Sequence, residues 1–492
     1  MLSLVFKSFL IHGHFSLYLL LATFIPILKD KLGSMNNSKN YRSIAISSLV
    51  LKLFDWIFLL IYGEKLELDD LQYAYQPGCS TTMCTWSVLE TIDYFIRNGS
   101  EVYTCCMDMT KAFDMLKHSI LFKKLIVANI PPVFVRLLMY LYMHQFANVK
   151  WNGVYSEAFP VANGVRQGGV SSAILYYFYC NILFQKLRLS GYGCWVNGNY
   201  NGIFGYSDDN LLLAPSQQAL QKMLLICEKF ADEHNLKFST DVNPSKCKTK
   251  CTAFSRKPVE LTAMKLCGNS LPWVNQFKHL GNTISNDLGY IDNDMNIKRA
   301  QYVNKCMELR QEFYFAAGDT LFELNQIYNS HFTGSPLWNL FGKHMSTLES
   351  SYNQSVKNMF NLPLATHRCL ISPITNYRHI RITLYARFLN FVKQLKSTNK
   401  KNSRLLFYHI MNDVGSTTGK NLRKIMLQTN KDTVDVLAVK DVNDIKYYPL
   451  TPEDEWKPIL LKELTKLADG SLVVDGFTTE ELNQMIYEIS VN

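Results

Sequence analysis

Apolar and polar positions along this chain follow patterns typical of helices in some stretches and of strands in others. Helical patterns with an apolar face or an apolar, aromatic run are typical of buried helices. They occur at 47–66, 117–130, 171–190 and 217–236. Short apolar runs bounded by polar residues are typical of strands and hairpins. They occur at 104–109, 200–213 (a hairpin), 247–255 and 276–284. Helical patterns dominate beyond about residue 290, so we predict an α+β core followed by a helical region.

The N-terminal stretch raises the alternative of a signal peptide or membrane anchor. Its uninterrupted apolar run, Phe15 to Leu28, has 14 residues. A helix needs roughly 20 apolar residues to cross a bilayer. Pro26 and Lys29 stand where a cleavage site would need small residues. We therefore predict a buried helix leading into a strand.

The chain has 492 residues, enough for two to four domains. With 48% hydrophobic and 19% charged residues, its composition is that of a globular protein. The formal net charge is +10, but residues 432–492 contain 13 acidic and 5 basic side chains. That segment carries −8 and the remainder +18. A basic body favours a polyanionic partner, most simply nucleic acid, although ordinary solubility charge is the alternative.

The 12 cysteines do not form a recognisable framework. Cys105 and Cys106 are adjacent, and Cys247 and Cys251 are the only other close pair. The chain has no CxxC pair, so a structural zinc site is not expected. Scattered thiols predict a reduced, intracellular protein.

Two adjacent carboxylates, Asp208 and Asp209, stand in the sequence FGYSDDNLLLAPS. The flanking apolar runs predict the arms of a hairpin, with Ser-Asp-Asp-Asn as its turn. The alternative is an ordinary solvated turn. Asp69-Asp70 is the same dipeptide without strand-like flanks, and we assign it no chemistry.

A third carboxylate, Asp108, ends a short apolar strand in CCMDMTKAFD. Clustered carboxylates are natural ligands for Mg²⁺, which prefers hard oxygen atoms. Two such ions held by three carboxylates can catalyse phosphoryl transfer. Asp108 and Asp208 are 100 residues apart, so only the fold can bring them together.

The glycine-rich stretch NGVRQGGVSSAIL spans 163–175 and leads into a predicted helix. Its glycines permit close backbone approach, and Arg166 and Gln167 offer hydrogen-bond donors there. The alternative is any polar loop before a buried helix. It lacks the Gly-Lys-Ser/Thr of a phosphate-binding P-loop.

Together, in this order, the three stretches resemble the reverse transcriptases of non-LTR (LINE-type, jockey-like) retrotransposons. CCMDMTKAFD resembles polymerase motif A, NGVRQGGVSS resembles motif B, and FGYSDDNLLLAPS resembles motif C. Further segments resemble other parts of the family, so the resemblance covers nearly the whole chain. These segments are 25–55, 72–82, 243–254, 277–285 and 327–341. Ser207 departs from the family, which commonly has Ala there.

The resemblance implies a right-hand polymerase of class α+β. Residues 1–285 would form fingers and palm with an antiparallel sheet, the fingers being truncated at the N-terminus. Residues 286–430 would form a helical thumb and C-terminal connection. Residues 431–492 would form an acidic, mostly helical tail.

The resemblance also implies the metal ligands and the catalytic acid. Asp108, Asp208 and Asp209 match the triad that binds two Mg²⁺ ions, with Mn²⁺ as an alternative ion. Lys246 matches a motif D lysine that would protonate the leaving pyrophosphate.

Nucleotide-binding residues follow from the same resemblance. Phe113 matches the bulky residue that excludes a ribose 2′-OH. Arg166 and Gln167 would contact the incoming nucleotide and the template. Arg42, with Lys29 or Lys31, would contact the triphosphate.

The function implied is RNA-directed DNA polymerisation with an RNA template, a DNA primer and deoxynucleotides. Such elements usually carry an N-terminal endonuclease, so we expect that activity to come from a missing domain or in trans. We expect no membrane association and a location in nucleus and cytoplasm without secretion. The alternative function is an inactive or domesticated nucleic-acid-binding remnant of such an element.

Overall fold

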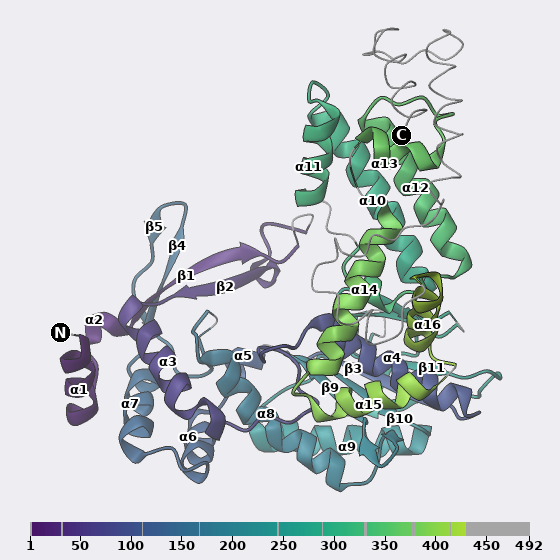
Figure 1. The fold of residues 1–492 in the computed structure, drawn as a ribbon. Coiled ribbons are helices and arrows are strands. Elements are labelled where there is room, and N and C mark those ends of the chain that lie inside the picture. The colour runs from purple at the N-terminus through teal and green to yellow at the C-terminus, as the bar shows by residue number, and fades with distance from the viewer. Residues whose placement is uncertain are drawn as a thin grey trace. The chain divides into compact units, whose positions relative to one another are not determined.

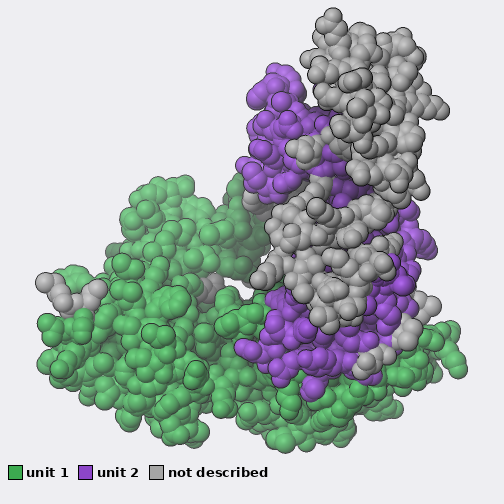
Figure 2. Space-filling view, in the orientation of Figure 1, with its two compact units in different colours: residues 1–84, 91–277, 400–402 green, residues 85–90, 278–399, 403–492 purple. Residues whose placement is uncertain are grey.

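The computed structural model describes residues 2–429 apart from 31–32, 111, 167, 244–245, 288, 329–331, 376, 378 and 414. The chain divides into two compact units, drawn in different colours in Figure 2. Unit 1 comprises residues 1–84, 91–277 and 400–402, and unit 2 comprises residues 85–90, 278–399 and 403–492. The predicted acidic tail at 431–492 lies outside the described residues.

The centre of unit 1 is a four-stranded antiparallel sheet in the order β11-β3-β10-β9 (Figure 1). Its strands are β3 (Val102–Met107), β9 (Ile203–Tyr206), β10 (Asp209–Ala214) and β11 (Lys250–Phe254). The predicted strand at 104–109, the hairpin at 200–213 and the strand at 247–255 are confirmed. Because β3 and β10 are buried along nearly all of their length, their apolar runs are continuous rather than alternating.

Helix α9 (Gln217–His234) packs on this sheet, as Figure 1 shows, and α8 (Ser172–Leu189) packs on α9. The apolar face of α9 includes Leu220 and Leu224, which are fully buried. The helix begins where predicted, because the Ser216 hydroxyl accepts a hydrogen bond from the Ala219 N–H.

A second sheet, in the order β2-β1-β4-β5 with β6 also paired to β4, was not predicted. Its strands are β1 (Leu21–Leu28), β2 (Tyr41–Ile46), β4 (Phe146–Trp151), β5 (Val154–Tyr155) and β6 (Phe159–Pro160). Strand β1 is antiparallel to β2 and parallel to β4.

The predicted buried N-terminal helix is wrong. Helix α1 (Leu2–His12) is largely exposed, and the apolar run forms the short α2 (Leu17–Leu20) followed by β1. Pro26 explains part of the difference, since proline lacks an N–H and breaks a helix interior. It is tolerated in β1 because it lies beyond the positions that pair with β4.

The other helices of unit 1 include three predicted ones. These are α3 (Leu49–Tyr62), α6 (His118–Val127) and α8, and the structure adds α4 (Thr81–Arg97), α5 (Ala112–Met115) and α7 (Pro132–Met143). Helix α4 contributes residues to both units. The remaining short elements are η1 (Ser38–Asn40), η2 (Gly63–Lys65), β7 (Trp195–Val196), β8 (Asn199–Tyr200), β12 (Met264–Leu266) and β13 (Asn269–Leu271).

Unit 2 is helical, as predicted for the chain beyond residue 290. Its main segment begins at residue 278, within the hairpin of β14 (Gln276–His279) and β15 (Asn282–Ser285). The later elements are α10 (Asp292–Glu312), α11 (Gly318–Tyr328), η3 (Ser335–Leu337), α12 (Lys343–Met359), α13 (Arg368–Thr375), α14 (Ile380–Ser397), α15 (Lys401–Asn412) and α16 (Thr417–Thr429). Among the described helices, none is long and apolar enough to span a membrane. The eleven cysteines whose side chains are described are free thiols.

Candidate functional site

A tight turn joins β9 to β10 and carries the first two functional candidates. The pairing of Asp209 with Tyr206 leaves only Ser207 and Asp208 in the turn, so it is shorter than the predicted four residues. Ser207 has φ +64°, a conformation that hairpin turns usually assign to glycine or asparagine. A serine held there costs about 1 kcal/mol or more of backbone strain. The turn thereby places both carboxylates at one end of the sheet.

The third carboxylate comes to the same end of the sheet from β3. Asn210 pairs with Met107, so the same register continued by one residue places Asp209 opposite Asp108. The Asp108 backbone is fixed on both sides. Its N–H donates to Thr249 Oγ1 (3.4 Å) and its carbonyl accepts from the Ser239 N–H (2.7 Å). The structure therefore brings together all three aspartates that the sequence singled out.

The three carboxylates repel one another. Burial, then Asp208 and Asp108, raise the pKa of Asp209 to about 6, while Lys248 opposes the rise. The repulsion by Asp208 and Asp108 adds to the effect of burial on the pKa of Asp209, and a bound cation would act on that repulsion.

Sequence reasoning missed Lys248. Its Nζ lies 3.6 Å from Asp108 Oδ2, and the lysine side chain is 71% exposed. Lys250 pairs with Cys106, so continuing that register by two residues places Lys248 opposite Asp108. Because the fold sets this register, the sequence alone did not indicate Lys248. The predicted acid, Lys246, is exposed in the preceding turn, where its N–H donates to the Asn243 carbonyl.

The donor chemistry of the triad fits divalent cations. As the side chains stand, the described residues contain no group of three His, Cys, Asp or Glu side chains that could hold an ion by itself. Mg²⁺ does not need such a cage, because it takes one or two protein carboxylates and completes its shell with water and phosphate oxygens. A cation would also relieve the repulsion that raises the pKa of Asp209. Asp108, Asp208 and Asp209 could therefore hold Mg²⁺ or Mn²⁺ together with a substrate.

The glycine-rich loop packs against α5, the short helix that holds Phe113. The Val165 N–H donates to the Phe113 carbonyl (2.8 Å), and Gly164 has φ +82°. A Cβ at Gly164 would lie 2.5 Å from the Phe113 carbonyl oxygen, so only glycine fits. The Phe113 ring is half-buried beside Tyr176, with ring centroids 4.8 Å apart.

Arg166 is buried rather than open to solvent. Its Nη2 lies 3.4 Å from Asp55 Oδ2 of α3, and both side chains are nearly inaccessible. Burial raises the pKa of Asp55, and Arg166 opposes that rise. Arg166 therefore anchors the loop to α3, and its predicted contact with a nucleotide stays a prediction. The neighbouring Gln167 lies outside the described residues.

Arg42 lies in β2 of the second sheet, and Lys29 directly follows β1. Arg42 pairs with Ile27, and side chains two apart on a strand share a face, so Arg42 and Lys29 point to the same side. Both residues are exposed. Their predicted contact with a triphosphate stays a prediction.

Asp69-Asp70, the other Asp-Asp dipeptide of the chain, has a structural role. Asp69 Oδ1 accepts hydrogen bonds from the Leu71 N–H (3.0 Å) and Arg188 Nη2 (2.8 Å). The Asp70 carboxylate accepts from the first N–H groups of α15, at Lys401 (2.9 Å) and the next residue (2.5 Å). Both carboxylates therefore have hydrogen-bond partners within the protein.

Residues 400–402 belong to unit 1, although the residues on either side of them belong to unit 2. Lys400 adds further hydrogen bonds to unit 1. Its buried Nζ donates to the carbonyls of Gln72 (2.7 Å) and Asp69 (3.4 Å). Unit 1 is therefore completed by residues distant in sequence.

Comparison with known proteins gives one family match. The family described as "Reverse transcriptase (RNA-dependent DNA polymerase)" matches residues 27–284, which include all three aspartates. Curated relatives include the "Retrovirus-related Pol polyprotein from type-2 retrotransposable element R2DM" of Drosophila melanogaster, 25% identical over 281 residues. That alignment covers 54% of this chain and 25% of the relative. The type-1 retrotransposable element R2 polyprotein of Nasonia vitripennis is 25% identical over 265 residues, covering 52% of this chain and 25% of the relative. This chain thus matches about a quarter of the length of these relatives.

Solved structures similar to this chain include two telomerases. Telomerase from Candida albicans, in complex with a fragment of telomeric RNA, gives a TM-score of 0.41 at 12% identity, covering 87% of this chain and 65% of that one. Apo telomerase from Candida tropicalis gives 0.41 at 12% identity, covering 85% and 69%.

Proposed function

The chain belongs to the reverse transcriptase (RNA-dependent DNA polymerase) family, and from that premise we propose that it copies RNA into DNA for a non-LTR retrotransposon. One observation carries the proposal. Three carboxylates from two distant segments, Asp108, Asp208 and Asp209, meet at one end of a sheet inside the matched region. The names of the R2 relatives support the retrotransposon as its source.

The reaction joins a deoxynucleotide to a primer. The primer 3′-OH attacks the α-phosphate, and pyrophosphate leaves as the new phosphodiester bond forms. Two divalent cations, when bound, would stabilise the charge that develops on the attacking and leaving oxygens. The three aspartates would hold these cations, and the hairpin of β9 and β10 would set where they lie. Fixed donors of this kind lower the barrier because they need no rearrangement during the reaction.

Lys248 is the cation placed beside the carboxylates, and we assign to it the proton donation that resemblance gave to Lys246. An ammonium within reach of the carboxylates can protonate the leaving pyrophosphate. Lys246 remains the alternative donor, since only two residues separate them.

Phe113 would select deoxynucleotides. Its half-buried ring rests on Tyr176, which limits the space that the ring can yield to a ribose 2′-OH. Removing the ring should allow ribonucleotides to bind and react. The preference for deoxynucleotides over ribonucleotides should fall about tenfold or more.

The remaining partners are an RNA template and a primer end. We place the primer-generating endonuclease outside these residues, either elsewhere in a polyprotein such as those of the relatives or in trans. Action in the nucleus follows from the proposed role, because the product must join chromosomal DNA.

Primer extension tests the proposal. Purified chain, a primed RNA template, deoxynucleotides and Mg²⁺ or Mn²⁺ should yield extended DNA. Asp208→Asn/Asp209→Asn should abolish it, because the cations lose their ligands. The matched control, Asp232→Asn/Glu233→Gln, removes two adjacent exposed acidic charges from α9 and should extend normally. If the wild type binds primed RNA without extending it, the polymerase proposal fails and a nucleic-acid-binding remnant replaces it.

A further inference from the structure

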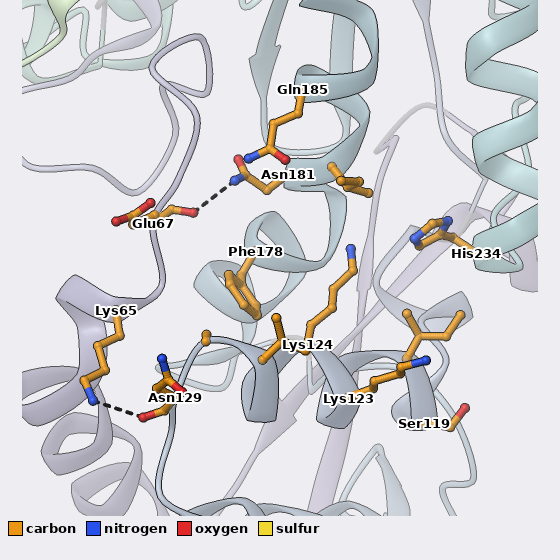
Figure 3. Close-up of a pocket in the computed structure, with 14 residues that line it drawn as sticks. Lys65, Glu67, Ser119, Lys123, Lys124, Asn129, Phe178, Asn181, Gln185 and His234 are labelled. Carbon is orange, nitrogen blue, oxygen red and sulfur yellow. Dashed lines mark hydrogen bonds between the residues drawn. The ribbon is translucent and has the colours of Figure 1, made fainter. Parts of the chain in front are cut away.

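Unit 1 contains a cavity of about 1010 Å³ that the polymerase reaction does not use (Figure 3). It lies between α6, α8 and the segment after η2, and none of the three catalytic aspartates lines it. Its volume is at the upper end of the range that holds small organic ligands, roughly 300–1,000 Å³. We propose that this cavity binds one or two nucleotides of single-stranded RNA. The proposal rests on the proposed function only for the identity of the strand as RNA.

Three lysines surround the cavity without a carboxylate partner. Lys65 comes from η2, and Lys123 and Lys124 come from α6. Lys65 Nζ donates to the Asn129 carbonyl (3.0 Å), and Lys124 Nζ donates to the Tyr179 carbonyl. No ion pair joins any of the three lysines to a carboxylate among the described residues. Glu67 is the one acidic residue of the lining, so the lining keeps an excess of positive charge.

Lys124 is the lysine whose charged form a bound anion would stabilise most. It is half-buried, its Nζ lies 5.1 Å from the Tyr179 ring centroid, and burial lowers its pKa to about 8. His234, which also lines the cavity, is buried, and its Nδ1 is 3.0 Å from the Phe230 carbonyl. Burial and then Lys124 lower the pKa of His234. No carboxylate pairs with Lys124 among the described residues, so a phosphate would stabilise its charge.

The cavity also offers a surface for a base. Phe178 of α8 is partly exposed in the lining, and its ring contacts no other aromatic ring among the described residues. Figure 3 shows the Phe178 ring between Lys124 and Asn129, with the Gln185 amide further along α8. The Gln185 side chain is exposed and available for a base edge, whereas Asn181 is occupied by the backbone of Glu67 and Asp69. Lysines beside an aromatic face are the combination that binds single-stranded nucleic acid.

Protection of Lys124 from chemical modification tests the site directly. The full chain is mixed with an unprimed single-stranded RNA oligonucleotide and lysines are trace-acetylated, with peptides read by mass spectrometry. We expect acetylation of Lys124 and Lys123 to fall about fivefold or more, following occupancy. Lys265, exposed on β12, should react equally with and without RNA. A deoxynucleoside triphosphate in a parallel arm, without divalent cations, should give little protection.

Charge-neutral variants test the contribution to affinity. Lys65→Gln/Lys123→Gln removes two exposed charges, and the matched control Lys257→Gln/Lys265→Gln removes two exposed charges elsewhere in unit 1. The cavity variant should bind the oligonucleotide about tenfold more weakly than the control. The slope of log K against log salt concentration should be shallower for the cavity variant by about 1.4. Each lost lysine contact with a single strand contributes about 0.7 to this slope. Phe178→Leu should weaken binding with the salt slope unchanged.

The possible results separate this proposal from the polymerase proposal. Unprotected lysines with equal affinities for the two double variants would overturn the cavity proposal, even if primer extension succeeds. Equal protection by the free triphosphate would overturn the assignment to an RNA strand. Failed extension with intact, RNA-dependent protection would reject the polymerase and leave the cavity proposal standing.

Discussion

At the scale of single residues, the lysine that lies beside Asp108 is not the one that motif position indicates. Lys246 occupies the motif position, yet Lys248 lies beside Asp108. The difference depends on the register of β11 against β3, which joins residues about 140 positions apart. The aspartates themselves could be predicted because their local sequences carry the information. The ion pair of Arg166 with Asp55 could not be predicted, because the two residues are 111 positions apart and no local pattern links them.

Separate substitution of the two lysines should distinguish them. We expect Lys248→Met to slow single-turnover incorporation of a deoxynucleotide by about 10²-fold, because a positioned proton donor contributes 10²–10⁴-fold. Lys246→Met should stay within about threefold of wild type. Rapid-quench measurement of one incorporation provides the rates. The reverse order of the two variants would return the role to Lys246.

A buried histidine in unit 2 should make stability depend on pH. Burial lowers the pKa of His279 to about 4 from 6.5, and its Nδ1 is 3.0 Å from Thr85 Oγ1. Since the folded value is the lower one, the unfolded chain takes up the proton first as the pH falls below 6.5. The free energy of unfolding should therefore drop by about 2 kcal/mol between pH 7 and pH 5 from this group alone.

Urea unfolding of the wild type and His279→Gln at the two pH values measures this effect. Other groups titrate equally in both proteins, so the difference between the two pH dependences isolates His279. The variant should lose about 2 kcal/mol less stability than the wild type on going to pH 5. Equal losses in the two proteins would contradict the prediction.

At the scale of elements, those encoded by one continuous stretch were predicted better than strands that pair with a distant part of the chain. Helix α9 and the β9–β10 hairpin are encoded by short, continuous stretches and were predicted correctly. The sheet around β1 was missed because β1 pairs in parallel with β4, about 125 residues later. Parallel pairing needs a long connection and leaves no turn signal between the two strands.

The glycine-rich loop provides a test of close packing between elements. Alanine at Gly164 would combine an unfavourable φ of +82° with a contact of 2.5 Å to the Phe113 carbonyl oxygen. Gly198 has a similar φ of +75° but open space around it, so Gly198→Ala carries the backbone cost alone. We expect Gly198→Ala to cost about 1 kcal/mol of stability with normal primer extension. Gly164→Ala should cost more and reduce extension at least tenfold, as measured by urea unfolding and single-turnover assays. Equal effects of the two variants would show that the contact can relax.

At the scale of the whole molecule, charge is divided between the body and the C-terminal segment. The segment 432–492 carries −8, and the rest of the chain carries +18. Opposite charge on the same chain weakens the attraction of the body for a polyanion, most strongly at low salt.

Removing the acidic segment should therefore strengthen binding to RNA. We expect a chain ending at residue 431 to bind unprimed RNA several-fold more tightly at about 50 mM salt, with the difference vanishing near 0.5 M. Filter binding across that range gives the comparison. A full-length chain with the 13 acidic residues changed to amides is the control for length. Weaker binding by both variants would exclude an electrostatic role.

The return of residues 400–402 to unit 1 has a consequence for synthesis on the ribosome. The bonds that Lys400 makes to the carbonyls of Gln72 and Asp69 cannot form until that residue has been translated. After residue 277 the ribosome must add 123 more residues, which takes roughly 6 to 25 s at 5–20 residues per second. During that interval, those two carbonyls and the carboxylate of Asp70 lack their native hydrogen-bond partners. Unit 1 therefore reaches its finished form only after residues 400–402 have been translated.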